Sequence, residues 1–293
     1  MTNNQHTNQL SLLAVATLLI STSGVLGKFI DLPTPTIIWL RCALGGLFLY
    51  LFCRYKSYNI KLKSKKDLPT ILLSALLLGT HWVTYFYALK LSNVALGMLS
   101  LFTFPVITAL LEPLFFKTKF NAVHIVLGVI VLIGIYILAP EFNFESGDVK
   151  GILLGVFSAF CYALRNLFLK QHVKQYNGTV LMLQQIGILS VVLLPVMFFM
   201  DVSNLKTQYP YVILLALVTT AIGHSLFIHT LKYFSVSTAS LINSVQPIFG
   251  IIMAYLFLNE IPNVNTFIGG TLILTTAIIE SNRSGKNKKN SSS

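Results

Sequence analysis

The sequence contains few charged residues and very few acidic ones. Of its 293 residues only 10% are charged, and just 9 are Asp or Glu against 21 Lys and Arg. A soluble domain usually carries about 25% charged residues. With 55% hydrophobic residues and a mean hydropathy of +0.74, the chain has too little polar surface for a soluble globular fold. The composition predicts an integral membrane protein.

Motifs for catalysis, nucleotide binding and metal binding are also missing. There is no Ser/His/Asp order with a nucleophile elbow, no phosphate-binding Gly loop and no HExxH sequence. We therefore expect no enzyme activity and no cofactor, and the absent Walker motif argues against an ATP-driven pump within this chain. The three cysteines, Cys42, Cys53 and Cys161, have neither CxxC nor Cys/His spacing. We expect no metal site and no disulfide framework, only small packing residues.

The first nine residues contain no Lys or Arg. A secretory signal peptide has a positive N-terminal region and a small-residue cleavage site, and neither is evident here. We expect the apolar segment that follows to remain as the first membrane helix.

Long apolar runs alternate with short polar ones along the chain. Each run is near the roughly 20 residues that a helix needs to cross a bilayer. A buried soluble core could explain one or two such runs but not all of them. The sequence predicts an all-α membrane fold with ten transmembrane helices, at residues 10–30, 34–53, 69–89, 94–116, 121–139, 151–171, 178–200, 209–230, 236–258 and 264–281.

The basic residues gather in the loops on one side of these spans. Cytoplasmic loops of membrane proteins are enriched in Lys and Arg, so this side is predicted to be cytoplasmic. With an even number of spans, both termini then lie in the cytoplasm and the protein belongs in the cytoplasmic membrane. Basic residues near the surface favour anionic lipids rather than nucleic acid as partners. The predicted cytoplasmic basic residues are Arg54, Lys56, Lys61, Lys63, Lys65, Lys66, Lys117, Lys119, Lys170, Lys174, Lys232, Arg283, Lys286, Lys288 and Lys289.

The chain also repeats itself. Pro105 corresponds to Pro247, and other residues recur at the same offset. If each copy supplies five spans, the second copy must enter the membrane from the opposite side. The sequence thus predicts two inverted five-helix repeats, residues 1–140 and 151–281, joined by an extracytoplasmic loop at 141–150 and followed by a basic cytoplasmic tail at 282–293. Inverted repeats are typical of secondary transporters, whose substrate site lies between the halves at mid-depth. The recurring pairs are Leu89 and Leu231, Lys90 and Lys232, Val94 and Val236, Leu99 and Leu241, Leu114 and Leu256, Asn121 and Asn263, and Gly128 and Gly270.

The paired prolines fall inside predicted spans four and nine. A proline within a helix removes one hydrogen bond and bends the helix. Kinks at Pro105 and Pro247 could simply shape packing. Their equivalent placement favours a moving or cavity-lining element.

These features resemble the EamA-type permeases of the drug/metabolite transporter superfamily. The resemblance rests on the paired prolines, on Leu256–Glu260 and Gly269–Leu274, and on Lys28 and Arg41, and it covers about residues 10–281. One departure is that the first half has Lys117-Thr118-Lys119 where the second half has Asn259-Glu260. The resemblance implies alternating-access transport of a small metabolite, an amino-acid-like compound or an amphipathic drug, most often exported.

Ionisable groups inside a membrane are costly and often functional. Arg41 in span two is either an anion clamp, because its guanidinium offers five donors, or a side chain that snorkels or pairs with Asp31. Gln184 is its counterpart in the second half, and we expect it in the cavity. For Arg165 in span six we favour snorkelling to the interface.

Aromatic and histidine side chains cluster in span three. His81, Trp82 and Tyr85 share a helix face and suit an amphipathic solute, although ordinary helix packing would give the same pattern. His224 lies at the matching depth of span eight and could carry a coupled proton or hydrogen-bond across helices.

Two further sites complete the expected set. Glu112 could protonate during transport, or it could pair with Lys117 or Lys119. Asn243 and Gln246 precede Pro247 on one face, where the first half has Leu101 and Phe104, so we expect them to line a cavity that is more polar on one side.

The sequence as a whole predicts a secondary active transporter that moves a small organic solute, with a proton as the candidate coupling ion. We expect helices five and ten to flank the path and support a homodimer. The other interpretations are a multidrug or toxic-compound exporter and a non-transporting membrane scaffold.

Overall fold

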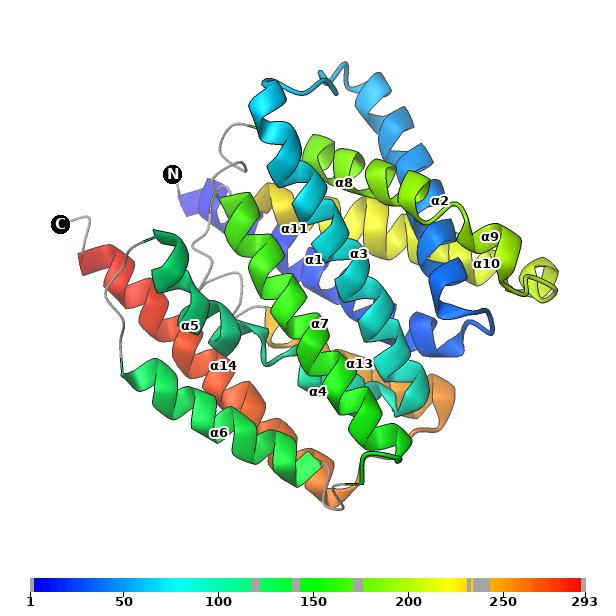
Figure 1. The fold of residues 1–293 in the computed structure, drawn as a ribbon. Helices are drawn as coiled ribbons and strands as arrows, with labels where there is room; N and C mark the ends of the chain where they lie inside the picture. The colour runs from blue at the N-terminus through cyan, green and yellow to red at the C-terminus, as the bar shows by residue number, and fades with distance from the viewer. Residues whose placement is uncertain are drawn as a thin grey trace.

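The computed structural model describes residues 3–116, 122–138, 143–170, 176–230, 233 and 243–290. Within these residues the secondary structure is helical, without strands (Figure 1). The first half contains α1 (Asn3–Phe29), α2 (Thr34–Tyr55), the short η1 (Lys65–Asp67), α3 (Leu68–Leu91), α4 (Val94–Leu101), α5 (Phe104–Phe116) and α6 (Val123–Leu138). The second contains α7 (Gly147–Lys170), α8 (Gly178–Val192), α9 (Val196–Phe199), α10 (Leu205–Leu214), η2 (Leu215–His224), α11 (Ser225–Thr230), α13 (Gln246–Leu258) and α14 (Val264–Asn290).

The all-helical fold agrees with the sequence-based expectation. Among the described residues, 7 helical segments are long and apolar enough to cross a membrane, and three more apolar helices, Val123–Leu138, Gln246–Leu258 and Val264–Glu280, are shorter. Ten crossings and an inverted arrangement of two repeats therefore remain predictions. Two boundaries differ from expectation, because α7 begins at Gly147, inside the predicted connecting loop, and α14 continues past 281 into the predicted tail.

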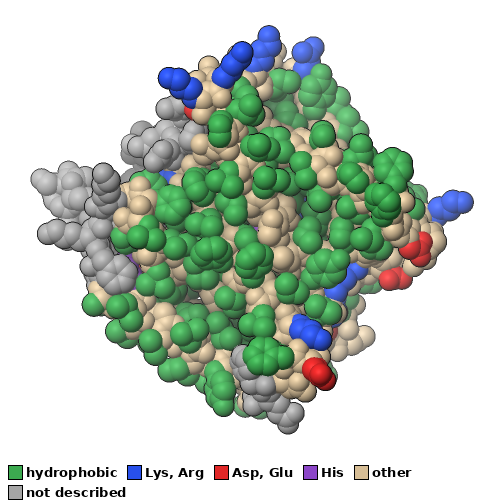
Figure 2. All heavy atoms as spheres, viewed as in Figure 1, with side chains coloured by type: hydrophobic (Ala, Val, Ile, Leu, Met, Phe, Trp, Pro, Cys, Tyr) green, Lys and Arg blue, Asp and Glu red, His purple; other side chains and the backbone are tan. Residues whose placement is uncertain are grey.

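The face of the molecule shown in Figure 2 has an apolar middle and charged edges. Hydrophobic side chains cover the middle of the face in Figure 2, and basic side chains crowd its top edge, above the connection from α2 to α3. The apolar middle of this face suits contact with lipid. The predicted basic residues Lys117, Lys119, Lys174 and Lys232 lie outside the described residues.

The predicted span at 94–116 is broken rather than continuous. Phe102 and Thr103 form a turn between α4 and α5, and Pro105 is the second residue of α5. The same arrangement occurs in the second half, where Ser244 and Val245 form a turn and Pro247 is the second residue of α13. Proline fits the first turn of a helix, where its missing N–H is not needed. Both prolines thus begin new helices instead of bending old ones.

Directly after α10 the chain continues as a helix with wider turns. The η2 segment is a π-helix, a form that is rare and often found at functional sites. It directs Thr219, Thr220 and His224 toward the bundle interior, where all three are buried.

Helices α6 and α14 pack against each other at the side of the bundle (Figure 1). Their contact depends on two glycines, because a Cβ on Gly269 would lie 2.7 Å from the carbonyl oxygen of Gly134. Small residues allow such close backbone approach between membrane helices. Cysteines 42, 53 and 161 are free and buried in the rest of the bundle, as packing residues would be.

Candidate functional site: a central polar cavity

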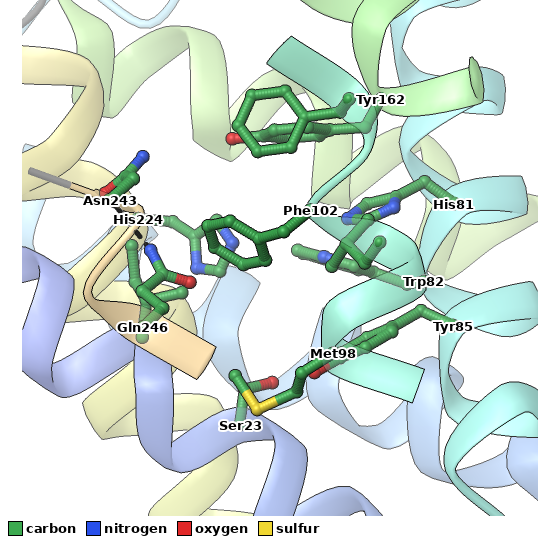
Figure 3. Close-up of a pocket in the computed structure, with 13 residues that line it drawn as sticks. Ser23, His81, Trp82, Tyr85, Met98, Phe102, Tyr162, His224, Asn243 and Gln246 are labelled. Carbon is green, nitrogen blue, oxygen red and sulfur yellow. Dashed lines mark hydrogen bonds between the residues drawn. The ribbon is translucent and has the colours of Figure 1, made fainter. Parts of the chain in front are cut away.

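A small cavity lies between helices of both halves of the chain (Figure 3). Its volume is about 50 Å³, which is room for a few water molecules. Helices α6 and α14 contribute none of its lining. The lining residues are Ile20, Ser23, His81, Trp82, Tyr85, Met98, Leu101, Phe102, Phe104, Tyr162, His224, Asn243 and Gln246.

Six of the eight residues expected in a substrate cavity line this space. His81, Trp82 and Tyr85 come from α3 on one side, and His224, Asn243 and Gln246 come from the second half on the other (Figure 3). Their spacing in sequence and their polarity inside an apolar span were the signals that pointed to them. Their role in binding a substrate remains a prediction.

The hydrogen bonds of His81 fix its neutral tautomer. Ser158 Oγ donates to the backbone carbonyl of His81 at 2.8 Å and lies 2.7 Å from His81 Nδ1. Because the serine proton is already used, Nδ1 donates to Ser158. The ring also packs against that of Tyr162, with ring centroids 4.7 Å apart and the two planes tilted by 31°. His81 therefore has Nε2 as its remaining acceptor.

His224 is held in the same way by the π-helix. Its Nδ1 lies 2.6 Å from the carbonyl oxygen of Thr219, which can only accept a hydrogen bond. Nδ1 consequently carries a proton, and in the neutral ring Nε2 is again the free acceptor. The imidazole packs edge-on against Trp82, with centroids 5.5 Å apart.

Asn243 and Gln246 form a small polar network with α1. Asn243 Oδ1 accepts a hydrogen bond from Gln246 Nε2 at 3.1 Å and lies 2.9 Å from Thr17 Oγ1, whose single proton is shared with the Leu13 carbonyl. With its oxygen occupied, the Asn243 amide nitrogen remains a donor at the cavity wall. Leu101 and Phe104, the first-half counterparts, line the same space, so the cavity is more polar on the side of the second half.

Arg41 lies behind the cavity wall and is fully buried. Its guanidinium is 3.9 Å from the centroid of the Trp82 ring, a cation–π contact. It donates to Thr220 Oγ1 at 2.6 Å, to Thr219 Oγ1 at 3.2 Å and to Ser23 Oγ at 3.3 Å. Snorkelling and pairing with Asp31 are both excluded by these contacts. The direct contacts of Arg41 with the described lining residues are those with Ser23 and Trp82.

Gln184 and Arg165 do not lie where the sequence predicts. Gln184 is not at the cavity, because its Nε2 donates to the carbonyl of Ile60 at 3.0 Å, in the connection after α2. The adjacent Gln185 faces inward and accepts from Arg165 Nη2 at 2.8 Å. The expectation that Arg165 snorkels is wrong, since the residue is 2% exposed and its guanidinium is hydrogen-bonded inside the bundle.

Glu112 lies away from the cavity, on α5. Its carboxylate pairs with Lys170 at the end of α7. The sequence-based alternatives, Lys117 and Lys119, lie outside the described residues. A proton-coupling role for Glu112 stays a prediction, and its position offers no direct contact with the cavity lining.

Sequence reasoning missed several lining residues. Ser23, Met98, Phe102 and Tyr162 are ordinary residues of apolar helices, and no local pattern distinguishes them. Tyr162 carried one usable signal, because it lies one helical turn before Arg165 and so shares its face. Among the described residues no group of three or more His, Cys, Asp or Glu could hold a metal ion.

Known proteins are similar to this chain in sequence and in fold. The chain is 24% identical over 271 residues to the pseudopaline exporter CntI of Pseudomonas aeruginosa, covering 92% of this chain and 93% of that protein. It is 23% identical over 269 residues to the uncharacterized transporter YxxF of Bacillus subtilis, covering 89% and 85%. A solved crystal structure with 16% sequence identity shares the fold, with a TM-score of 0.68 over 96% of this chain and 98% of that one.

A model of the EamA-like transporter family matches the chain twice, at residues 8–139 and 149–281. The two matches together include the cavity-lining residues from both sides. The chain is thus a multi-pass membrane protein that belongs to the EamA-like transporter family.

Proposed function

We propose that this protein is a secondary active transporter that moves a small organic solute across the cytoplasmic membrane by alternating access. The observation that carries the proposal is the central cavity, which is enclosed by helices of both family matches and combines polar groups with aromatic walls. Ligand sites of this kind are mostly apolar with a few polar groups that fix orientation.

The size of the cavity supports a moving mechanism. About 50 Å³ holds a few waters but no organic solute, whereas ligand pockets usually measure about 300–1,000 Å³. The helices must therefore separate before a solute enters. Two inverted five-helix repeats, rocking about the cavity, would expose it to one side at a time.

Export is the proposed direction. One relative is named an exporter, of pseudopaline. The basic connection after α2 suits a cytoplasmic face with anionic lipids, and with ten spans this orientation would put both termini in the cytoplasm. A multidrug or toxic-compound exporter is the second candidate, supported by the aromatic wall of Trp82, Phe102 and Tyr162. A non-transporting scaffold is disfavoured, since it would not require buried polar groups around a cavity.

Flux measurements on purified protein in liposomes test the proposal. The panel comprises labelled amino acids, organic carboxylates and cationic drugs, with protein-free liposomes as the blank. We expect saturable flux of at least one solute. Trp82→Ala should reduce this flux, because Trp82 forms the cavity wall. Trp39→Phe, a change of the other tryptophan, outside the lining, should preserve it. Correctly folded protein without saturable flux for any solute would contradict the proposal.

A further inference from the structure

The charged side chains that the structure describes near the cavity are two positive ones. Arg41 is fully buried, and Arg165 is 2% exposed. Both guanidinium groups interact electrostatically with His81 and with His224, which line the cavity from opposite sides. Two buried cations therefore flank one small space.

Neither arginine has a carboxylate partner among the described residues. Arg41 donates to three hydroxyl groups, and Arg165 donates to the side-chain oxygens of Gln185 and Asn166. The sequence limits what else could neutralise them, because the chain has only 9 acidic residues. Eight are described, and none of these eight lies within 4.0 Å of either guanidinium. The ninth, Glu141, belongs to the connection between α6 and α7. The acidic residues are Asp31, Asp67, Glu112, Glu141, Glu145, Asp148, Asp201, Glu260 and Glu280.

A buried charge without a partner is expensive, by several kcal/mol per ion. Neutral hydroxyl and amide oxygens, together with the Trp82 ring, satisfy the hydrogen-bonding geometry but leave both positive charges in place. In a low-dielectric interior these charges are weakly screened and raise the potential throughout the cavity. The site is thus prepared for a negative charge that the protein itself does not supply.

Hydrogen-bond donors also converge on this space. Ser23 Oγ accepts from Arg41, so its own proton is available to the cavity. Asn243 offers its amide nitrogen, because its oxygen is already occupied. The Tyr85 hydroxyl lines the cavity without a hydrogen-bond partner in the described part of the chain. Three groups can therefore donate to an anion without breaking existing bonds.

The helix ends contribute smaller partial charges of both signs. α5 and α13 each begin at the cavity, since their first residues, Phe104 and Gln246, are part of its lining. A helix N-terminus carries a partial positive charge of about half a unit, and a C-terminus the opposite. α4 ends at the same place as α5 begins, with Leu101 in the lining, so these two ends offset each other and the main positive charge comes from Arg41 and Arg165.

We infer that the transported solute is an organic anion, a carboxylate attached to an apolar or aromatic body. This inference rests on the proposed transport function and names its substrate class. The carboxylate would lie near Ser23 and Asn243, while the body would contact Trp82, Phe102 and Tyr162 when the helices separate. A cationic drug would be repelled from the same cavity.

Equilibrium binding to the purified full-length chain tests the inference without requiring transport. Trp39→Phe leaves Trp82 as the only tryptophan, so its fluorescence reports on the cavity wall. Matched probes differ only in charge: 3-phenylpropionate, 3-phenylpropionamide and 3-phenylpropylamine, with 4-methylpentanoate, its amide and its amine as an aliphatic set. We expect at least one carboxylate to bind about tenfold more tightly than its amide, with the amine weakest.

Charge removal should then abolish this preference. Arg41→Gln and Arg165→Gln each keep a hydrogen-bonding amide but remove the cation, and each should lower the carboxylate-to-amide ratio several-fold. Arg41→Lys should retain most of the ratio. Arg54→Gln, at the exposed end of α2, is the matched control and should leave it unchanged. If Arg41→Gln fails to fold, Arg165→Gln still tests whether the preference for the carboxylate depends on the buried charge.

Three results would overturn the inference: equal binding of acid and amide, tighter binding of the amines, or no binding by any probe. Its failure is distinguishable from failure of transport. Saturable flux of neutral or cationic solutes without anion binding would refute the inference alone, whereas anion binding without flux in liposomes would refute transport alone.

Discussion

Lys28 and Lys90 cap each other's helices. Lys28 Nζ, at the end of α1, donates to the carbonyl of Ser92 at 2.6 Å and to that of Lys90 at 3.3 Å, just where α3 ends. Lys90 Nζ returns the interaction by donating to the carbonyl of Ile30 at 2.9 Å, beyond the end of α1. Helix C-termini have unpaired carbonyls and a partial negative charge, so two ammonium groups stabilise two helix ends at once.

Replacing either lysine should therefore destabilise the fold. Lys28→Met keeps the length of the side chain but loses two charge-assisted hydrogen bonds, and we expect a cost of about 1–3 kcal/mol. The double variant with Lys90→Met should cost more. Thermal unfolding followed with a thiol-reactive dye is a suitable measurement, because Cys42, Cys53 and Cys161 are buried until the chain unfolds. Lys56→Met, at an exposed position after α2, is the control. An unchanged melting temperature for the double variant would contradict this role.

The glycine contact between α6 and α14 leads to a second prediction. Gly269→Ala places a methyl group 2.7 Å from the Gly134 carbonyl oxygen, which is backbone and cannot rotate away. We expect a loss of about 1–3 kcal/mol from overpacking. Gly187→Ala in α8 is the matched control, since nothing lies within 4 Å of its added Cβ. The control should be neutral or stabilising by up to about 1 kcal/mol, because alanine favours helix. Equal melting temperatures for the two variants would rule out a tight glycine contact.

The third prediction addresses proton coupling, for which Glu112 and His224 are the candidates. His224 lines the cavity beside Trp82, and Nε2 is the nitrogen that can take up a proton. Arg41, Arg165 and His81 oppose that added positive charge, so His224 can act as the coupling group only if the bound solute offsets it. His224→Gln can still donate to the Thr219 carbonyl but cannot carry a proton. We expect it, like His224→Ala, to abolish any dependence of flux on a pH gradient in liposomes.

Glu112→Gln is the parallel variant. Because Glu112 pairs with Lys170 away from the cavity, we expect the substitution to lower stability more than it changes the pH dependence. If both variants kept the full dependence on the gradient, neither residue could be the coupling group.

A fourth prediction concerns the polar side of the cavity. Asn243→Leu installs the residue that the first half has at Leu101 and leaves the Gln246 amide without its acceptor. We expect a loss of about 1–3 kcal/mol and at least a tenfold fall in the rate of flux. Asn59→Leu, in the exposed connection after α2, should leave flux intact. Normal flux through the Asn243→Leu variant would remove Asn243 from the candidate site.

Much of the fold and part of the site can be predicted from the sequence. The length of the apolar runs predicts the helices. Polar residues inside these runs, such as His81 and Asn243, are rare and therefore indicate candidate site residues. The helix break at Phe102 is not predictable from Pro105 alone, because proline is compatible with both a kink and a new first turn. The prediction that Arg165 snorkels was wrong because it rested on the distance of the residue from the membrane surface. That distance does not reveal that Gln185, on the neighbouring helix, faces the guanidinium.

The paired helix breaks change what the cavity does for stability. At Phe102–Thr103 and at Ser244–Val245 the regular backbone hydrogen bonding of a span is interrupted beside the cavity, and lipid cannot replace those bonds. The cavity lies beside both breaks, since Phe102, Phe104, Asn243 and Gln246 line it, and its room for a few water molecules offers main-chain groups of both halves another partner. An ordinary core gains stability when a void is filled with methyl groups. Here we expect the opposite: a larger apolar side chain in place of Ser23, such as Val or Leu, would close this space and destabilise the two helix breaks.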